Sequence, residues 1–547
     1  MSAAEKLITE HLETWTASVK TKSSAGRGAG KKRELYGIKK LRELILELAV
    51  RGLLVPQDPN DEPASELLKR IASVKAKLIK DGEIKKQKKL PRINDSDIPF
   101  ALPESWEWTR LGEATNYGKS DKAESSDVNE STWVLELEDI EKSTSKLLQK
   151  VRFKDRNFKS SKNRFRKNDV VYGKLRPYLD KVIVADEPGV CTTEMIPLRG
   201  YSSIKPEFLR LSMKTPSFIK YANDSTHGMN LPRMGTDKAR AALIPLAPEN
   251  EQRRIVAKVD ELMELCDRLE RETETQLDTH QTLVETLLAA LTDAASTPAQ
   301  LAQAWQRIAA HFDTLFTTES SIDHLKQTIL QLAVMGKLVE RKSSPDFSSL
   351  GELLSIASIN GVSKGPTQDS SAIEVLKISA GTSRDDFYVD ETDFKHVDLQ
   401  SSEVEKYKLK PGDLLACRYN GNLHFVGKFS EYRGFTGKTQ VNPDKLIRFR
   451  FDQSKYSPRY ICFAMNSAQT RQTIEAMCAT TAGNIGLSAG KIKTVKIPIP
   501  PLAEQRRIVA KVDELMSLCD ALKAKLQAAQ TTQLHLTDTL ASSAVGN

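Results

Sequence analysis

Cysteine is scarce in this chain of 547 residues, and its six cysteines stand far apart. No Cys-x-x-Cys pair occurs, which argues against a structural zinc site and against a disulfide framework. The eight histidines form no cluster with metal-ligand spacing. The first residues carry no apolar signal segment, and no stretch is long and apolar enough to cross a bilayer. These absences predict a cytoplasmic protein with reduced cysteines and no metal of its own.

Catalytic motifs are also scarce. Gly112–Ser120 resembles a phosphate-binding loop, but five residues separate its glycines where that loop has four. Glu83-Ile84-Lys85 matches the acidic-x-lysine half of a nuclease triad, which chance explains in a lysine-rich stretch. The Asp-Pro-Pro-Tyr and Asn-Pro-Pro-Tyr tracts with which amino-methyltransferases grip a flipped base do not occur. We therefore expect no catalytic residue in this chain.

The charge balance favours a polyanionic partner. Lysine and arginine number 81 against 72 aspartates and glutamates, which gives a net charge of +9 and a pI of about 9.0. Such a balance favours nucleic acid, although many basic proteins bind none. Residues 23–33 form a basic segment rich in Gly and Ser, which reads either as a solvated tether or as a phosphate contact. A chain of this length is expected to fold as several structural units.

The most informative feature is an internal repeat. Residues 251–263, Glu-Gln-Arg-Arg-Ile-Val-Ala-Lys-Val-Asp-Glu-Leu-Met, return without a change at 504–516. A looser repeat joins residues 38–55 to residues 322–339, so the chain consists of two tandem halves. A duplicated chain can fold with an internal pseudo-two-fold axis. Such an axis presents two similar surfaces to a target that is itself roughly two-fold, and duplex DNA is such a target.

The pattern of apolar and polar residues in each half predicts an α+β fold, with two globular strand-rich domains separated by long antiparallel coiled-coil helices. Short apolar runs between turns predict the strands, and apolar residues at helical spacing predict the helices. The expected segments are a helical N-terminal region with a basic linker (1–99), a first strand-rich domain (100–246), a central helical spacer (247–340), a second strand-rich domain (341–500) and a C-terminal helix (501–547). A coiled-coil seam, in which the cysteines are small core residues, is expected at matching positions of the repeated helices: Ile255, Val259, Leu262, Cys266, Leu269, Ile508, Val512, Leu515, Cys519 and Leu522.

Side chains suited to nucleic acid gather in two segments of each strand-rich domain. Arg can bind guanine through two hydrogen bonds, Asn can bind adenine in the same way, and Lys and Arg can neutralise phosphates. An ordinary polar turn between strands is the alternative for any one residue. The candidate DNA-binding residues are Lys174, Arg176, Tyr178, Lys181, Asn230 and Arg233 in the first domain and Arg418, Asn420, Asn422, His424 and Asn484 in the second.

Several of these segments together resemble one known family. The doubled tract follows Pro248 in the first half, with an altered Pro248-Glu249-Asn250 start, and Pro501 in the second. Gly173–Lys181 and Gly412–Leu423 look like recurrent recognition-domain segments of the same family. Nearly the whole chain thereby resembles the specificity subunit of type I restriction-modification enzymes, the HsdS family. The N-terminal stretch 36–44 is most similar to the EcoAI-like branch.

The resemblance implies a division of labour. Two target recognition domains would each read one half of a bipartite, asymmetric DNA site, and the helices between them would act as a ruler and as docking surface for two methyltransferase subunits. S-adenosylmethionine would be bound by the methyltransferase subunits, and ATP with Mg²⁺ by restriction and translocase subunits, while this chain catalyses nothing. Two rival interpretations stay open: a single-chain DNA-modifying enzyme, which would need a cofactor pocket, and a coiled-coil scaffold without sequence specificity, which would not need two dissimilar domains.

Overall fold

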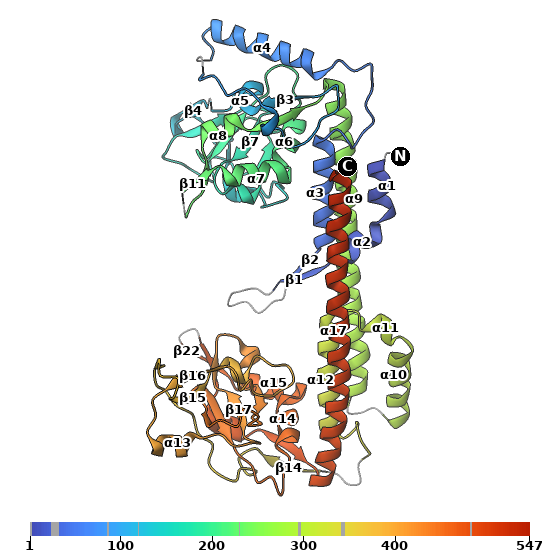
Figure 1. The fold of residues 1–547 in the computed structure, drawn as a ribbon, viewed down its shortest axis with the longest axis vertical. Helices are drawn as coiled ribbons and strands as arrows, with labels where there is room; N and C mark the ends of the chain where they lie inside the picture. The colour runs from blue at the N-terminus through green and yellow to red at the C-terminus, as the bar shows by residue number, and fades with distance from the viewer. Residues whose placement is uncertain are drawn as a thin grey trace. The chain divides into compact units, whose positions relative to one another are not determined.

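The computed structural model describes residues 3–22, 32–84, 87–118, 120–228, 230–293, 297–340, 345–481 and 484–546. The chain divides into two compact units (Figure 1). The first unit comprises residues 1–20, 34–273 and 532–547, and the second comprises residues 21–33 and 274–531. Most of the predicted basic linker, residues 23–31, lies outside the described residues.

The strand-rich domain of the first unit is built from four small sheets. One has the strand order β4-β6-β9-β5, with β5 and β9 parallel, and another has the order β10-β7-β8 with antiparallel neighbours. β3 pairs with β13 and thereby joins the beginning of the domain to its end, and β11 pairs with β12. The strands are β3 (Glu107–Arg110), β4 (Lys122–Ala123), β5 (Trp133–Leu135), β6 (Lys162–Phe165), β7 (Val170–Gly173), β8 (Val182–Val184), β9 (Gly189–Cys191), β10 (Met195–Leu198), β11 (Thr226–His227), β12 (Arg233–Met234) and β13 (Leu243–Leu246).

The apolar run of β7 is continuous because both faces of this strand are buried. Val170 and Tyr172 belong to one apolar cluster, which also contains Leu209 and Met213 of α6 (Pro206–Lys214). Val171 belongs to a second cluster on the opposite face, because successive side chains of a strand point to opposite sides. A strand covered on both faces needs no polar alternation.

Helices surround this domain and form a bundle beside it. α3 contacts α2, α6 and α7, and its Ile38, Leu41, Ile45 and Leu48 are buried, as their helical spacing predicts. α4 lies across the strand-rich domain, and its Ala64, Leu67 and Ile71 are buried there (Figure 1). The other helices of this unit include short segments and the ends of two long helices: α1 (Ala3–Glu10), α2 (Leu12–Ala17), α3 (Tyr36–Val50), α4 (Ala64–Lys80), α5 (Leu111–Ala114), α7 (Pro216–Asp224), α8 (Thr236–Ala241), the beginning of α9 (Glu249–Thr292) and the end of α17 (Leu502–Gly546). A further pair of strands, β1 (Lys20–Lys22) and β2 (Lys32–Glu34), precedes α3 in the sequence and belongs mostly to the second unit.

The second unit has the same plan. Its sheets have the strand orders β16-β15-β20, β19-β17-β21, β14-β24 and β18-β23-β22. The strands are β14 (Asp346–Ser349), β15 (Ile373–Leu376), β16 (Phe394–Val397), β17 (Leu414–Cys417), β18 (Tyr419–Asn420), β19 (Phe429–Glu431), β20 (Gln440–Val441), β21 (Leu446–Phe449), β22 (Ala479–Thr481), β23 (Asn484–Gly486) and β24 (Lys496–Ile499). The helices are α10 (Pro298–Ala310), α11 (Phe312–Leu315), α12 (Glu319–Met335), α13 (Ser401–Tyr407), α14 (Pro458–Asn466), α15 (Ala468–Ala476) and α16 (Ala489–Lys493), with the end of α9 and most of α17.

Element by element, the two strand-rich domains correspond. The central strand β7 of the first domain matches β17 of the second, the helix pair α6–α7 matches α14–α15, and β13 matches β24 just before each long helix. A glycine with a positive φ follows each of two matching helices, Gly52 (70°) after α3 and Gly336 (72°) after α12, as is common at helix C-termini. The internal repeat of the sequence is therefore a repeat of structure.

The predicted seam is buried at most of its positions. Ile255, Val259, Leu262 and Cys266 are buried in the first unit, and Ile508, Val512 and Cys519 are buried in the second. Leu269, Leu515 and Leu522 are only half-buried, and Met516 takes a buried place beside Leu515. In the second unit these side chains share one apolar cluster with α12 and α14, so the seam binds the long helix to its own domain as well as to its neighbouring helix.

Candidate nucleic-acid interface

The two predicted DNA-binding segments of the first domain meet on one surface. Leu175 forms an antiparallel bridge with Arg233. The backbone N–H of Arg176 donates to the carbonyl of Pro232 at 2.7 Å, and the N–H of Met234 donates to the carbonyl of Lys174 at 3.0 Å. Residues more than fifty positions apart in the sequence therefore form a single loop pair.

Side chains on this loop pair differ in their exposure and in the contacts that they make. Tyr178 is 52% exposed, and Arg176 and Asn230 are also exposed. Arg233 instead binds Glu194 through Nε at 2.9 Å, which raises the pKa of the guanidinium above its ordinary value. Lys181 donates through Nζ to the carbonyl of Leu137 at 2.7 Å, and partial burial lowers its pKa. Arg176, Tyr178 and Asn230 are thus better placed to touch a ligand than Arg233 and Lys181.

The predicted segments of the second domain also meet. Tyr419 and Asn420 form β18, which pairs with β23 in the register Tyr419↔Gly486 and Asn420↔Ile485. β23 begins at Asn484, which is exposed, and it pairs in turn with β22. The structure thereby brings the Arg418–His424 segment against Asn484 from another part of the chain.

Aromatic stacking fixes the shape of this second surface. The guanidinium of Arg418 lies over the ring of Tyr419, 4.7 Å from its centroid. The same ring covers Gly486, where an added Cβ would lie 2.3 Å from a ring carbon, so a residue with a side chain cannot replace this glycine without displacing Tyr419. Arg418 is therefore held by an aromatic platform rather than by a carboxylate.

The two asparagines of this segment brace the loop internally. Asn420 Oδ1 accepts the backbone N–H of Asn422 at 3.0 Å, and Asn422 Oδ1 accepts the backbone N–H of His424 at 3.0 Å. His424 is exposed, and its ring lies edge-on to Phe425. A carboxamide oxygen has two lone pairs, so each Asn can still bind a base, but both also stabilise the turn.

Sequence reasoning missed the residues that support these loops. Arg471 of α15 donates to the carbonyl of Val426 at 2.8 Å and to that of His424 at 3.2 Å, and so closes the second loop from behind. In the first domain Lys214, the last residue of α6, binds Asp180 beneath the loop from a different helix of the pair. Neither residue stands out in the sequence, because a single cation in an amphipathic helix is indistinguishable from an ordinary surface charge.

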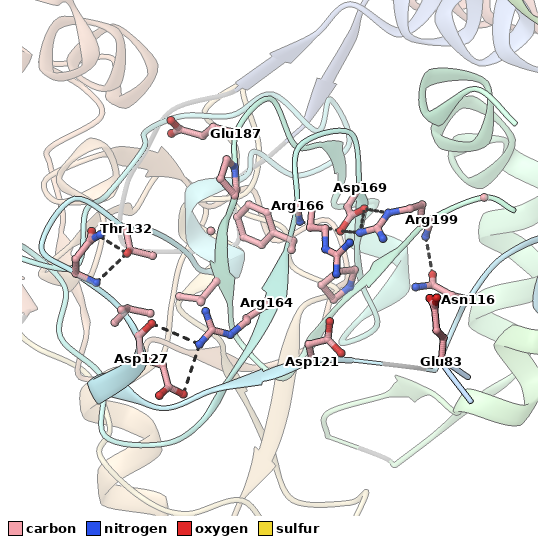
Figure 2. Close-up of a pocket in the computed structure, with 18 of the residues that line it drawn as sticks. Glu83, Asn116, Asp121, Asp127, Thr132, Arg164, Arg166, Asp169, Glu187 and Arg199 are labelled. Carbon is pink, nitrogen blue, oxygen red and sulfur yellow. Dashed lines mark hydrogen bonds and ion pairs between the residues drawn. The ribbon is translucent and has the colours of Figure 1, made fainter. Parts of the chain in front are cut away.

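A large open cavity of about 1320 Å³ lies elsewhere in the first unit (Figure 2). It is lined by charges of both signs that bind one another: Arg199 contacts Asp169 through Nε at 2.7 Å, and Arg164 lies 3.5 Å from Asp127. None of the predicted DNA-binding residues lines it. Glu83 does, although Lys85 of the same motif lies outside the described residues. Paired charges of this kind offer neither an activated nucleophile nor an apolar cofactor slot.

The two cysteines of the seam, Cys266 and Cys519, are buried, as the sequence predicts. All six are free, and burial raises the pKa of Cys266 and of Cys519 to about 11, so both thiols stay protonated and pack as small apolar groups. Within the described part of the chain, no group of three His, Cys, Asp or Glu side chains is arranged to hold a metal ion. Among the described helices, none combines the length and the apolar character needed to span a membrane.

Known proteins match this chain over different lengths, and two of them match 99% of it. The family model described as "Type I restriction modification DNA specificity domain" matches residues 348–530. The EcoEI specificity subunit of Escherichia coli, a type I restriction enzyme subunit, is 36% identical, with 99% of this chain and 100% of that protein covered. The EcoAI specificity subunit of Escherichia coli is 35% identical at the same coverage. The EcoKI specificity subunit of E. coli K12 is 31% identical over only 41% of this chain and 48% of its own length.

A solved structure gives the same result for the fold. A chain from a structure of complex assembly and conformational transition of the type I R-M system has a TM-score of 0.53 at 20% identity, covering 82% of this chain and 99% of its own. At that identity the likeness shows the fold alone, and it confirms the α+β class with two strand-rich domains and long helices. The whole-chain matches confirm the family expected from the doubled tract and agree with the EcoAI-like branch. With 35–36% identity over the full length of two such proteins, the chain belongs to the family of type I restriction enzyme specificity subunits.

Proposed function

We propose that this chain reads a bipartite, asymmetric DNA site for a type I restriction-modification complex, one half-site with each strand-rich domain. The proposal rests on one observation: the two domains share a frame, meaning the same arrangement of strands around the loop, but carry different loops. In both domains the loop after the central strand pairs with a later hairpin. The first loop offers Arg176 and Tyr178, whereas the second offers Arg418 on Tyr419 with a series of amides. Different loops in the same frame suit different half-sites.

The partners follow from the same argument. The two helix tracts are identical in sequence, and identical surfaces suit two copies of one partner, which we take to be the methyltransferase subunit. S-adenosylmethionine would then reside on the methyltransferase subunits, and ATP with Mg²⁺ on restriction and translocase subunits, while this chain contributes recognition without catalysis. A cytoplasmic location follows from this role, because the DNA to be read is there.

Exchange of one recognition domain is the direct test. Residues 341–500 are replaced by the corresponding domain of the EcoAI specificity subunit, and the methylated motif of the host genome is sequenced with each gene and with neither. The expected motif keeps the first half-site and acquires a new second half-site. A motif in which both half-sites change would contradict the assignment of one half-site to each domain. The reciprocal exchange of residues 100–246 is the matched control.

A further inference from the structure

Four residues with a left-handed backbone lie in the recognition loop of the first domain and in the segment that holds its base. Seven non-glycine residues of the described chain have a positive φ, and four of them are Ser143 (68°), Ser145 (58°), Arg176 (50°) and Asp180 (49°). L-residues avoid this left-handed region because Cβ approaches the following carbonyl. Such conformations persist only where surrounding contacts impose them, and they often mark functional positions.

The two strained segments, one with Ser143 and Ser145 and the other with Arg176 and Asp180, bind each other directly. The backbone N–H of Ser143 donates to the carbonyl of Leu179 at 2.9 Å. The hydroxyl of Ser145 donates to the carbonyl of Asp180 at 2.5 Å and accepts the N–H of Val182 at 3.2 Å. Ser143 and Ser145 thus hold the loop at three places between Leu179 and Val182.

A buried lysine joins the two segments. Lys214 Nζ, at the end of α6, lies 2.5 Å from Asp180 Oδ2, 2.8 Å from Ser145 Oγ and 3.2 Å from the carbonyl of Ser143. These contacts use all three donors of the ammonium group. The side chains of Lys214 and Asp180 are 8% and 10% exposed. Removal of one partner from such a buried pair leaves an uncompensated charge, so the loop base depends on both.

The upper side of the loop remains accessible. Arg176 is exposed, Tyr178 is 52% exposed, and the backbone of Arg176 is anchored to Pro232 by its N–H. A loop that is already fixed loses little conformational entropy when it binds. The base of the loop therefore affects how well its top can bind, although no residue of the base needs to touch the ligand.

Resting on the function proposed above, we propose that Lys214 is a positioning residue for recognition of the first half-site. Through Asp180 and Ser145 it holds Arg176 and Tyr178 in the geometry that reads DNA. The second domain does not use this device. Asn466 occupies the position in α14 that Lys214 has in α6, and it binds both backbone groups of Phe429 in β19 instead of a recognition loop. Loss of Lys214 should consequently affect one half-site only.

The experiment measures two discrimination ratios with the assembled complex of this chain and its methyltransferase partner. Affinity is determined for a duplex with the full site, a duplex with the first half-site scrambled and a duplex with the second half-site scrambled. Each discrimination ratio is the affinity for the full site divided by the affinity for the duplex with one half-site scrambled. In Lys214→Met the ratio for the first half-site should shrink by about tenfold, while the ratio for the second half-site stays within about twofold of its natural value. Arg199→Met is the matched control, since it breaks a pair with the buried Asp169 at the opposite end of β7 and should leave both ratios unchanged.

Three outcomes overturn the positioning role: no change in either ratio, an equal change in both, or the same selective loss in Arg199→Met. If thermal unfolding shows that Lys214→Met does not fold, Ser145→Ala replaces it, with an expected selective loss of about threefold. A folded Ser145→Ala protein without a selective loss also overturns the role. Arg176→Ala distinguishes failure of the proposed function from failure of the positioning role. An unchanged first ratio in Arg176→Ala contradicts the proposed function of the loop, whereas a selective loss there without one in Lys214→Met contradicts the positioning role alone.

Discussion

Gln505 accepts a hydrogen bond from the backbone N–H of Ser457 at 2.8 Å, through which the C-terminal long helix is fixed to its own recognition domain. Gln252 makes the matching contact with the N–H of Lys205 at 2.9 Å in the first half. Both glutamines are buried, and Ser457 and Lys205 are the residues just before α14 and α6. Part of the identity between the two tracts therefore has an intramolecular cause, namely the fixed junction of helix and domain.

The first prediction is that Gln505→Leu destabilises the second unit without affecting partner affinity directly. In the natural chain Gln505 accepts the N–H of Ser457 and donates through Nε2 to the carbonyl of Pro500 at 2.8 Å. Leucine can do neither, so both backbone groups lose this partner. Unpaired buried backbone groups of this kind cost about 1–3 kcal/mol. Faster amide hydrogen exchange at the beginning of α14 is the measurement. Arg506→Ala, the exposed neighbour in the same tract, should change exchange there very little; equal effects of both substitutions would contradict the junction.

The exposed positions of the repeated tract lead to the second prediction. Arg253 and Arg506 occupy matching positions, and both are exposed. If identical tracts dock two copies of one partner, charge reversal at Arg506 should remove one copy and reversal at both should remove two. Mass measurement of the assembled complex gives the stoichiometry directly. Lys525→Glu, an exposed position of α17 beyond the repeated tract, is the control. Retention of both partner copies in the double variant would refute docking through these positions.

Much of this fold could be predicted from periodicity. The strands Val182–Val184 and Met195–Leu198 and the helix from Glu249 follow from local patterns and are observed where they are expected. The left-handed Arg176 could not be predicted, because no local signal marks a strained non-glycine residue. The half-burial of Leu515 beside the buried Met516 depends on which neighbours the helix meets, which a heptad pattern alone does not specify.

Only part of the candidate site, like part of the fold, could be predicted from the sequence. Residue chemistry pointed to a loop after each central strand, but the pairing of Leu175 with Arg233 is a long-range contact that composition cannot show. The ion pair between Arg233 and Glu194 is equally invisible in the sequence, because Arg233 begins β12 and Glu194 lies in the distant turn before β10. Which of the predicted side chains contact DNA stays a prediction, and the next experiment addresses it.

The third prediction separates base reading from phosphate binding. Alanine at Arg418, held on its aromatic platform, should cost about 1–3 kcal/mol and relax specificity at one position of one half-site. Alanine at Lys174 should weaken all sequences alike and reduce the dependence of affinity on salt by about one phosphate contact. Affinities for matched and mismatched duplexes at several salt concentrations distinguish the two effects. If alanine at both positions leaves affinity, specificity and salt dependence unchanged, these loops are not the DNA-binding surface.

The fourth prediction concerns pH. Burial raises the pKa of Asp180 from 3.8 to about 6, although the nearby Lys214 opposes the shift. The folded protein therefore holds this proton more tightly than the unfolded chain, so the contribution to stability is present below pH 4 and is lost as the pH rises to about 6. The free energy of unfolding of the natural chain minus that of Asp180→Asn should fall over this interval, by at most about 3 kcal/mol. A difference that rises with pH would contradict the burial effect.

The last prediction tests the helices as a ruler. α9 passes from the first unit to the second after residue 273, and α17 passes between them at residue 531. Four residues inserted near Thr279, with four more near Thr531, should lengthen both helices by about 6 Å and nearly preserve their helical phase. Thr279 is exposed, so the insertion there disturbs no buried side chain at that position.

Both half-sites should survive such an insertion unchanged, because neither recognition domain is altered. At roughly 3.4 Å per base pair, the spacer between them should grow by one to two base pairs. The measurement is the methylated motif before and after insertion. Alanine substitution of Thr279 without insertion controls for local damage and should leave the spacer as it was. An unchanged spacer in a folded, active variant would refute the ruler, because a rigid helix pair that sets the separation of two reading domains cannot be lengthened without moving the sites they read.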